Sequence, residues 1–328
     1  MLQPSETAEG PLAVAGGQRM AILIPCYNEE MAIADVVAGF RAALPGAEIY
    51  VYDNNSTDRT AEVARSAGAI VRRELHQGKG HVVRRMFADV DADIYLLVDG
   101  DATYDAPSAR RMIARLVDER LDMVVGARID QEQAAYRRGH RVGNRLLTGF
   151  VADVFGRVFT DMLSGYRAFS RRFVKSFPVL SGGFEIETEF TVHALELGLP
   201  VAEVPTPYYA RPSGSASKLH TWRDGFRILW TITRLYKLER PLPFFGTIGI
   251  VLALVSIVLA IPLTVTYLRT GLVPRLPTAV LVTGLMLLAF LSVTCGLILG
   301  TVTRGRREVK LLAYLAHNGP GEGPGRSG

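Results

Sequence analysis

The sequence predicts an α/β protein with a doubly wound, mostly parallel sheet, followed by an amphipathic interface helix and a two-helix transmembrane hairpin. Short apolar segments alternate with segments of helical periodicity from residue 20 to residue 125, which is typical of right-handed strand-helix-strand units. Aromatic and basic side chains then alternate over residues 221–240, as in a helix that lies in a membrane interface. Finally, two uncharged runs, Pro241–Leu268 and Leu276–Thr303, each exceed the roughly 20 residues that cross a bilayer as a helix.

The composition of the 328 residues is that of a folded protein, with 48% hydrophobic and 21% charged side chains. The formal net charge is +5, but basic residues gather beside the apolar C-terminal runs, which favours a membrane surface over nucleic acid as the partner. Because the only two cysteines are Cys26 and Cys295, a disulfide framework is excluded and the soluble part is expected in the cytosol. We expect residues 1–18 to form a disordered tail.

Predicted strands and helices alternate through the first half of the chain. The strands are expected at Met20–Cys26, Glu48–Tyr52, Ala69–Val71, Ile94–Val98 and Met123–Val125. The helices are expected at Met31–Leu44, at Arg59–Ala67, from the Gln77–Gly80 turn to about Asp89, and at Pro107–Arg120. Pro45 and Gly46 end the first helix, and we expect Ser56 and Thr57 to cap the second.

Beyond Arg128 the alternation stops. Residues 136–145 are basic, and we expect the mixed segment 161–167 to cover the sheet. A helix at Glu185–Leu197, a strand at Val201–Val204 and a loop rich in Gly and Ser at Arg211–Leu219 follow. The predicted divisions are the tail 1–18, an α/β domain at 19–218, the interface helix at 219–242, the hairpin at 243–303, and a basic and then Gly/Pro-rich tail at 304–328.

The charges around the two apolar runs predict their orientation. Arg269 and Arg275 lie in the connection between the runs. More basic residues flank the runs on the outside, namely Arg234, Lys237, Arg240, Arg304, Arg306, Arg307 and Lys310. Since cytoplasmic segments carry an excess of Lys and Arg, we expect a plasma (inner) membrane protein with two spans whose α/β domain and both termini face the cytoplasm.

Two carboxylates, Asp99 and Asp101, follow the predicted strand Ile94–Val98. Open α/β sheets bind their ligands at this edge, where the strands end. Two carboxylates one residue apart can share a hard cation such as Mg²⁺ or Mn²⁺, which keeps other positions for water and diphosphate oxygens. The spacing alone favours an ordinary turn or a helix N-cap. Only other motifs in the chain can favour a metal site over that interpretation.

Seven motifs occur in a specific order: IPCYNEE (24–30), YDNNSTDRT (52–60), QGKG (77–80), VDGDATYD (98–105), GAR (126–128), DMLSGYRAF (161–169) and SKL (217–219). Over about residues 20–220 they resemble the family 2 inverting glycosyltransferases of the GT-A fold, and among them the polyprenyl-phosphate glycosyltransferases, which include dolichyl-phosphate mannose synthase and undecaprenyl-phosphate glucosyltransferases. The resemblance implies transfer of a sugar from a UDP- or GDP-linked donor to polyprenyl (undecaprenyl or decaprenyl) phosphate, for cell-envelope glycan or glycoconjugate synthesis.

The resemblance also implies roles on the donor side. The donor would be bound by Pro25, Tyr27, Asn28, Glu29, Asp53, Lys79, Asp99 and Lys218. Lys79, between two glycines at a predicted helix start, can approach a diphosphate as a point charge; the alternative is a solvated lysine in a turn. Asp99, Asp101 and Thr103 would form the metal set, with Asp101 in direct contact, and Thr103 stands where some relatives have a metal-ligating glutamine.

On the acceptor side, the resemblance assigns the lipid phosphate to Arg128 with Arg137 or Arg138, near His140 where some relatives have serine. An ionised phosphate, whose second pKa is ~6, can attack the sugar without a strong base. Asp101, Arg128 and Asp161 are the predicted catalytic residues; Asp161 either orients the acceptor or acts as a base. The acidic pair Glu185 and Glu187 either lines the same cavity or lies on a surface helix face.

Two other functions stay open. A polysaccharide synthase of the same family would use hydroxyl acceptors, but the Gln-x-x-Arg-Trp signature and additional spans expected of it do not occur in the sequence. A catalytically silent, membrane-anchored protein that binds nucleotide-sugars would not need intact Asp99, Asp101, Lys79 and Arg128. Relatives with hairpin tails can pack into oligomers, so the resemblance also allows a homo-oligomer.

Overall fold

The computed structural model describes residues 18–130, 159–179, 183, 186–210, 233–234 and 236–320. It divides into two compact units: Met1–Gly225 together with Lys310–Gly328, and Phe226–Val309. Most of the expected interface helix, residues 219–242, and the expected tail 1–18 apart from Gln18 lie outside the described residues.

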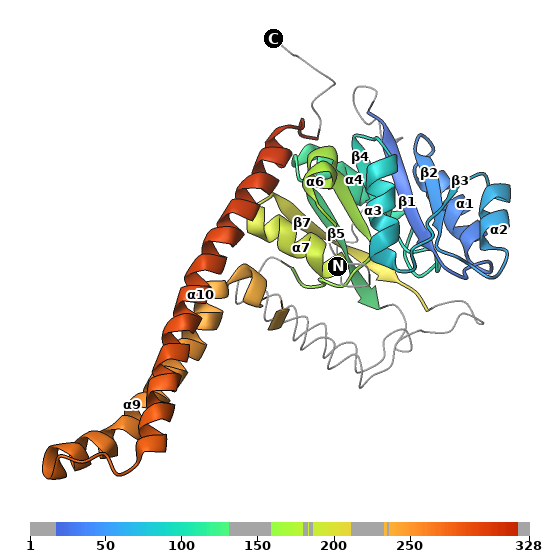
Figure 1. Ribbon diagram of the computed structural model, residues 1–328. Helices are drawn as coiled ribbons and strands as arrows, with labels where there is room; N and C mark the ends of the chain where they lie inside the picture. Colours follow the sequence, from blue (N-terminus) through green and yellow to red (C-terminus); the bar gives the residue numbers. More distant parts are fainter. Residues whose placement is uncertain are drawn as a thin grey trace, which may run out of the picture. The chain divides into compact units, whose positions relative to one another are not determined.

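The first unit is built on a seven-stranded sheet of order β3-β2-β1-β4-β6-β5-β7 (Figure 1). Its strands are β1 (Met20–Cys26), β2 (Glu48–Asp53), β3 (Ile70–Arg73), β4 (Ile94–Leu97), β5 (Met123–Asp130), β6 (Arg167–Ser170) and β7 (Val201–Tyr208). Only β6 runs antiparallel to its neighbours within this sheet, which confirms the predicted mostly parallel sheet. The segment 161–167, expected to cover the sheet, ends in the first residue of β6, a strand that the sequence did not predict.

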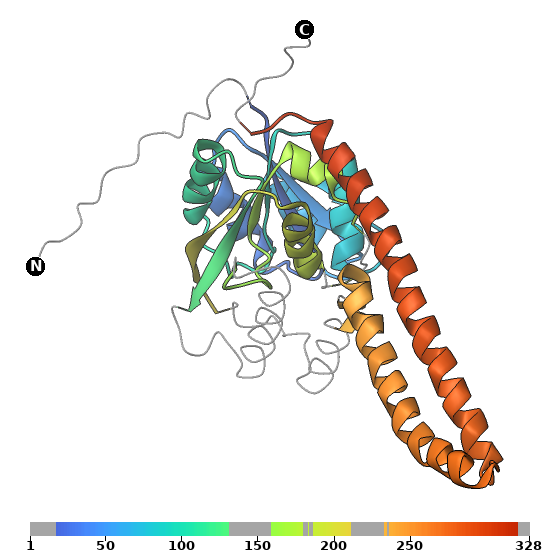
Figure 2. The same cartoon turned by 90° about the vertical axis from the view of Figure 1, so that its left-hand side faces the viewer.

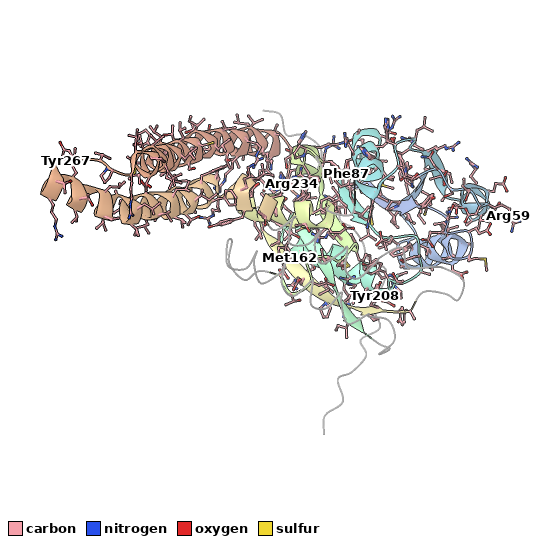
Figure 3. All side chains as sticks on the ribbon, turned by 60° about the horizontal axis from the view of Figure 1, so that its bottom comes forward. Arg59, Phe87, Met162, Tyr208, Arg234 and Tyr267 are labelled. Atoms are coloured by element: carbon pink, nitrogen blue, oxygen red, sulfur yellow. The ribbon has the colours of Figure 1, made fainter. Side chains whose placement is uncertain are left out.

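Helices cover both faces of the sheet (Figures 1 and 2). They are α1 (Ile33–Ala43), α2 (Thr60–Ser66), α3 (Lys79–Asp89), α4 (Ser108–Asp118), α6 (Arg171–Ser176) and α7 (Ile186–Leu197). Side chains alternate across a strand, so in β4 Leu96 joins the aliphatic core with α1 and α4, whereas Tyr95 packs against Phe87 of α3. Phe87, labelled in Figure 3, also contacts Phe169, Phe177 and Phe190.

The strand directions bring several loops to one edge of the sheet. β1, β2 and β4 are parallel, and β5 is parallel to them because β6 is antiparallel to both β4 and β5. The carboxyl ends of these strands and the amino end of β6 therefore meet at the same edge. This arrangement gathers the motifs that follow β1, β2 and β4, the carboxyl-terminal half of β5 and the segment that precedes β6.

The second unit holds two long apolar helices, α9 (Pro241–Thr270) and α10 (Leu276–Leu315), of which α10 continues into the first unit from Lys310. Their most apolar windows have mean hydropathies of 2.8 and 2.3, and only 11% of each window is buried. A core helix of a soluble protein would be mostly buried, so these exposed apolar faces suit a lipid environment. The predicted pair of helices long and apolar enough to cross a membrane is confirmed.

Small residues bring α9 and α10 close together. A Cβ on Gly249 would lie 2.8 Å from Val293 Cγ2 and 2.9 Å from the Ala289 carbonyl oxygen. The Ser256 hydroxyl, fully buried, donates to the Val282 carbonyl at 2.9 Å. Both features are typical of helix pairs that pack within a bilayer, where close backbone approach and interhelical hydrogen bonds replace the hydrophobic effect.

Candidate active site

The turn after β4 holds Asp101 in one orientation. Gly100 is required there, because a Cβ would lie 2.5 Å from Cys26 Sγ, and Ala102 adopts a left-handed backbone with φ 57°, which is costly for a residue with a side chain. Asp101 is buried, and its Oδ1 accepts hydrogen bonds from the Thr103 amide at 3.2 Å and the Thr103 hydroxyl at 2.6 Å. Thr103 therefore fixes the Asp101 carboxylate.

The turn after β4 that carries Asp99 and Asp101, called the acidic turn below, suits a hard divalent cation whose other ligands come from a bound diphosphate. Asp99 and Asp101 supply carboxylate oxygens, the ligands that Mg²⁺ and Mn²⁺ prefer. Within the described ranges, no group of three or more His, Cys, Asp or Glu side chains could hold a metal ion. A cation bound through one or two carboxylates and completed by diphosphate oxygens matches this set. The role of Thr103 as a third ligand stays a prediction.

Lys79, the first residue of α3, is anchored between two carboxylates. Its Nζ donates to Asp99 Oδ1 and to Glu187 Oε1 of α7, each at 2.5 Å. Burial of Lys79 would lower its pKa, but the two carboxylates outweigh that effect and raise the pKa well above its ordinary value, so the ammonium stays charged. Lys79 is thus neither solvated nor free to act as an isolated point charge. Its predicted contact with a diphosphate remains a prediction.

The loop before β6 closes over the Lys79–Asp99 pair. A Cβ on Gly165 would lie 2.5 Å from Asp99 Oδ2 and 3.0 Å from Lys79 Nζ. The Gly165 amide donates to the Tyr104 hydroxyl at 2.9 Å, and burial raises the pKa of Tyr104 far above its ordinary range. The glycine therefore lets the backbone pack directly against the acidic turn.

Arg128 and Asp161 form a two-point ion pair at the same edge. Arg128 donates from Nε to Asp161 Oδ2 at 2.6 Å and from Nη2 to Oδ1 at 2.8 Å. Its guanidinium carbon lies 5.4 Å from the ring centre of Tyr208. Burial would raise the pKa of Asp161, but its hydrogen bonds with Arg128 and the charge of that arginine lower it below the ordinary value. A carboxylate held this way is a weak base.

A fully buried arginine, Arg167, shapes the loop that carries Asp161 and Gly165. Its guanidinium donates to the carbonyl oxygens of Met162 at 2.5 Å and Ser164 at 2.9 Å, and to the Thr191 hydroxyl at 3.0 Å. Burial lowers the pKa of Arg167 to about 10, so it remains protonated at neutral pH. The sequence motif contains Arg167, but nothing in the motif indicates this role.

Replacing Arg167 with methionine is expected to lower the free energy of unfolding by about 3 kcal/mol, since buried acceptors left without donors cost about 1–3 kcal/mol each. Urea titration of the detergent-solubilised protein measures the change. The control is Arg85→Met, which removes an exposed ion pair with Asp89 and is expected to cost under about 1 kcal/mol. Equal effects of the two substitutions would contradict the role of Arg167.

The turns after β1 and β2, which hold residues predicted to bind the donor, are joined by hydrogen bonds. The Asn28 amide donates to Ser56 Oγ at 2.9 Å, and the Thr57 amide donates to Asn28 Oδ1 at 2.8 Å. Asn28 reaches this position through a left-handed backbone with φ 53°. The expectation that Ser56 and Thr57 cap α2 is wrong: α2 begins at Thr60 without a side-chain cap, because Ser56 and Thr57 bond to Asn28 instead.

Other residues that were predicted to bind the donor lie on or next to these two turns. Pro25 lies on β1 beside Tyr52 of β2, followed by Tyr27 and Glu29, whose amide donates to Thr60 Oγ1 at 2.8 Å. Asp53, at the end of β2, is 5% exposed. The sequence reading also missed Asn54, whose Oδ1 accepts from the Gly78 amide at 2.7 Å and so positions the turn that starts α3.

The edge of the sheet thus carries Asp53, Lys79, Asp99, Asp101, Arg128 and Asp161, together with Gly165. Of the two positions left open for Glu187, a surface helix face is wrong, because its side chain is buried against Lys79. Several predicted residues lie outside the described residues: Arg137, Arg138, His140, Glu185 and Lys218. Acidic and basic groups therefore meet where parallel strands end, the position at which open α/β sheets bind ligands.

Comparison with known proteins gives consistent matches. The model of glycosyl transferase family 2 matches residues 21–177. A glycosyltransferase of Haloferax volcanii, AglJ, is 41% identical over 232 residues, which cover 70% of this chain and 76% of that protein. A dolichyl-phosphate hexose transferase of the same organism is 28% identical over 67% of this chain and 95% of that protein.

Among solved structures, glucosyl-3-phosphoglycerate synthase of Mycobacterium tuberculosis shares the fold, with a TM-score of 0.54 and 22% identity over 67% of this chain and 80% of that one. The same synthase has been solved in complex with Mn²⁺ and uridine-diphosphate-glucose, and that structure matches with a TM-score of 0.53.

Proposed function

The chain belongs to glycosyl transferase family 2, and we propose that it transfers a sugar, with inversion, from a UDP- or GDP-linked donor to polyprenyl phosphate at the cytoplasmic face of the membrane. The observation that carries this proposal is the combination in one chain of the acidic turn, the Arg128–Asp161 pair and two exposed apolar helices. The similarity to a dolichyl-phosphate hexose transferase supports a lipid phosphate as the acceptor.

The donor side of the proposal rests on the acidic turn. Asp99 and Asp101 would hold Mg²⁺ or Mn²⁺, which when bound supplies positive charge beside the leaving diphosphate. Thr103 keeps the Asp101 carboxylate in place through its hydroxyl. The Mn²⁺ and uridine-diphosphate-glucose bound by the synthase of similar fold support the same class of ligands here.

The acceptor side rests on Arg128. An arginine suits a phosphate because its planar guanidinium offers paired donors, and Asp161 holds that guanidinium in a fixed orientation. A phosphate acceptor is already ionised near neutral pH, with a second pKa of ~6. Since Asp161 is a weak base, an acceptor that needs no deprotonation agrees better with this pair than a hydroxyl does.

Orientation follows from charge. We expect the first unit and both termini on the cytoplasmic side, because basic residues flank α9 and α10 on the outside more densely than they occupy the connection between the helices. Cysteine labelling at positions 269 and 317 of a Cys-free chain, with a membrane-impermeant reagent on intact cells and then on inverted vesicles, tests this. Labelling of position 317 in intact cells would contradict the orientation.

The proposed reaction can be tested directly. Full-length protein in detergent is incubated with Mn²⁺ or Mg²⁺, a panel of UDP- and GDP-sugars, and undecaprenyl phosphate or undecaprenol. We expect a product with one sugar per lipid, from the phosphate and not from the alcohol. No lipid-linked product with any donor, or a polymer, would overturn the proposal; a polymer would instead identify a polysaccharide synthase.

A further inference from the structure

We propose that Glu187 is a positioning residue of the transfer reaction: by sharing the Lys79 ammonium with Asp99, it leaves Asp99 with negative charge for the cation. The inference rests on the proposed function, because it concerns the same acidic turn. The sequence left open whether Glu187 lines the cavity, but it gave Glu187 no partner, and Lys79 lies 108 positions away in sequence.

Three side chains from separate elements meet in this cluster. Lys79 begins α3, Asp99 follows β4, and Glu187 lies in the first turn of α7. The side chains of Lys79 and Glu187 are 8% and 6% exposed, whereas that of Asp99 is 29% exposed. Asp99 is thus the member of the cluster that an incoming ligand can reach.

The charges of Lys79, Asp99 and Glu187 indicate how Glu187 affects a bound cation. Lys79 and Asp99 alone would neutralise each other, and Asp101 would then be the main attraction for a cation. With Glu187 included, the single positive charge of Lys79 is shared between two carboxylates, so Asp99 keeps part of its negative charge for a divalent cation. Opposite charges attract strongly where water is partly excluded.

Both carboxylate oxygens of Asp99 are held close to neighbouring groups, so the carboxylate cannot turn away from Lys79. Its Oδ1 accepts from Lys79 Nζ, and the Gly165 backbone lies so close to Oδ2 that a Cβ there would be 2.5 Å away. Asp99 therefore has little room to change its orientation. If Glu187 were uncharged, the Lys79 ammonium would pair with Asp99 alone and compete with a cation for it.

The test compares Glu187→Gln with the unaltered full-length protein in detergent. Mn²⁺ binding is measured by electron paramagnetic resonance of free Mn²⁺, in the presence of UDP or GDP, whichever tightens Mn²⁺ binding to the unaltered protein. We expect the Kd for Mn²⁺ to rise about tenfold. Glu187→Asp, which keeps the charge, is expected to stay within about threefold of the unaltered protein.

A matched control comes from the other end of α7. Glu196 is also buried and accepts from a lysine, Lys310 Nζ, at 2.7 Å. Nine residues of helix separate it from Glu187, roughly 13 Å along the axis. Glu196→Gln removes the same kind of ion pair but is expected to leave the Kd for Mn²⁺ unchanged. A rise equal to that of Glu187→Gln would show a general loss of structure and overturn the proposal.

A double-mutant cycle with Lys79→Met tests whether Glu187 acts through Lys79. Without the ammonium, Asp99 has no competing cation, so adding Glu187→Gln to Lys79→Met is expected to change the Kd for Mn²⁺ less than about twofold. The same tenfold change in both backgrounds would overturn the proposal. Mn²⁺ binding needs no acceptor. Failure of the proposed role of Glu187 can therefore be distinguished from failure of the proposed lipid phosphate acceptor.

Discussion

Asp101→Asn is expected to abolish sugar transfer while leaving the protein folded. The carboxylate is buried at the edge of the sheet and held by the Thr103 amide and hydroxyl, so the amide that replaces it fits the same space without the charge. Loss of a charge that stabilises a leaving diphosphate is expected to reduce kcat/KM by about 10³-fold. Initial rates at saturating Mn²⁺ measure this effect, and circular dichroism verifies the fold.

Two substitutions at Thr103 separate positioning of Asp101 from direct metal binding. Thr103→Ser keeps the hydroxyl and is expected to retain activity within about threefold, whereas Thr103→Val removes it and is expected to cost about tenfold, the worth of one hydrogen bond. A loss with Thr103→Val as large as that with Asp101→Asn would instead support the predicted role of Thr103 as a ligand. Near-normal turnover by Asp101→Asn would contradict the prediction that Asp101 binds the metal.

The parallel core of the fold could be predicted because its strands are short apolar runs that end in polar motifs. β1 is predicted at its observed bounds, and β2 and β4 differ by one residue at one end. β6 could not be predicted in this way, because Arg167–Ser170 has no apolar run, and its hydrogen bonds come from β4 and β5, far away in sequence. Strand order in such a sheet depends on pairings that local patterns do not contain.

The site was predictable to the extent that its residues follow strands. Asp99 and Asp101 do so, and Arg128 lies near the carboxyl end of β5, which extends to Asp130 instead of ending at Val125 as predicted. Parallel strands bring these ends together. The partners that fix those residues were not predictable, because each is a contact between separate segments: Glu187 with Lys79, Gly165 with Asp99, and Arg167 with Thr191. Their residue types alone are common on surfaces, and only packing gives them a role.

The two roles that the sequence left open for Asp161 make opposite kinetic predictions. Its lowered pKa keeps the carboxylate ionised, so its contribution to stability is present above the ordinary aspartate pKa of about 4 and is lost only as the pH falls further. If Asp161 orients Arg128, it has no titration near neutral pH that affects the rate. A general base would instead be matched to the operating pH.

Asp161→Asn is therefore expected to lower kcat/KM for the lipid acceptor by about 10²-fold through loss of the two-point pair with Arg128, with KM for the donor unchanged. The acid limb of the pH–rate profile is expected to stay where it is. Asp89→Asn, which removes a partly exposed carboxylate bonded to Arg85, serves as the control and should leave all constants unchanged. Disappearance of the acid limb in Asp161→Asn would assign Asp161 as the base, and an acceptor that must be deprotonated would then be favoured over a lipid phosphate.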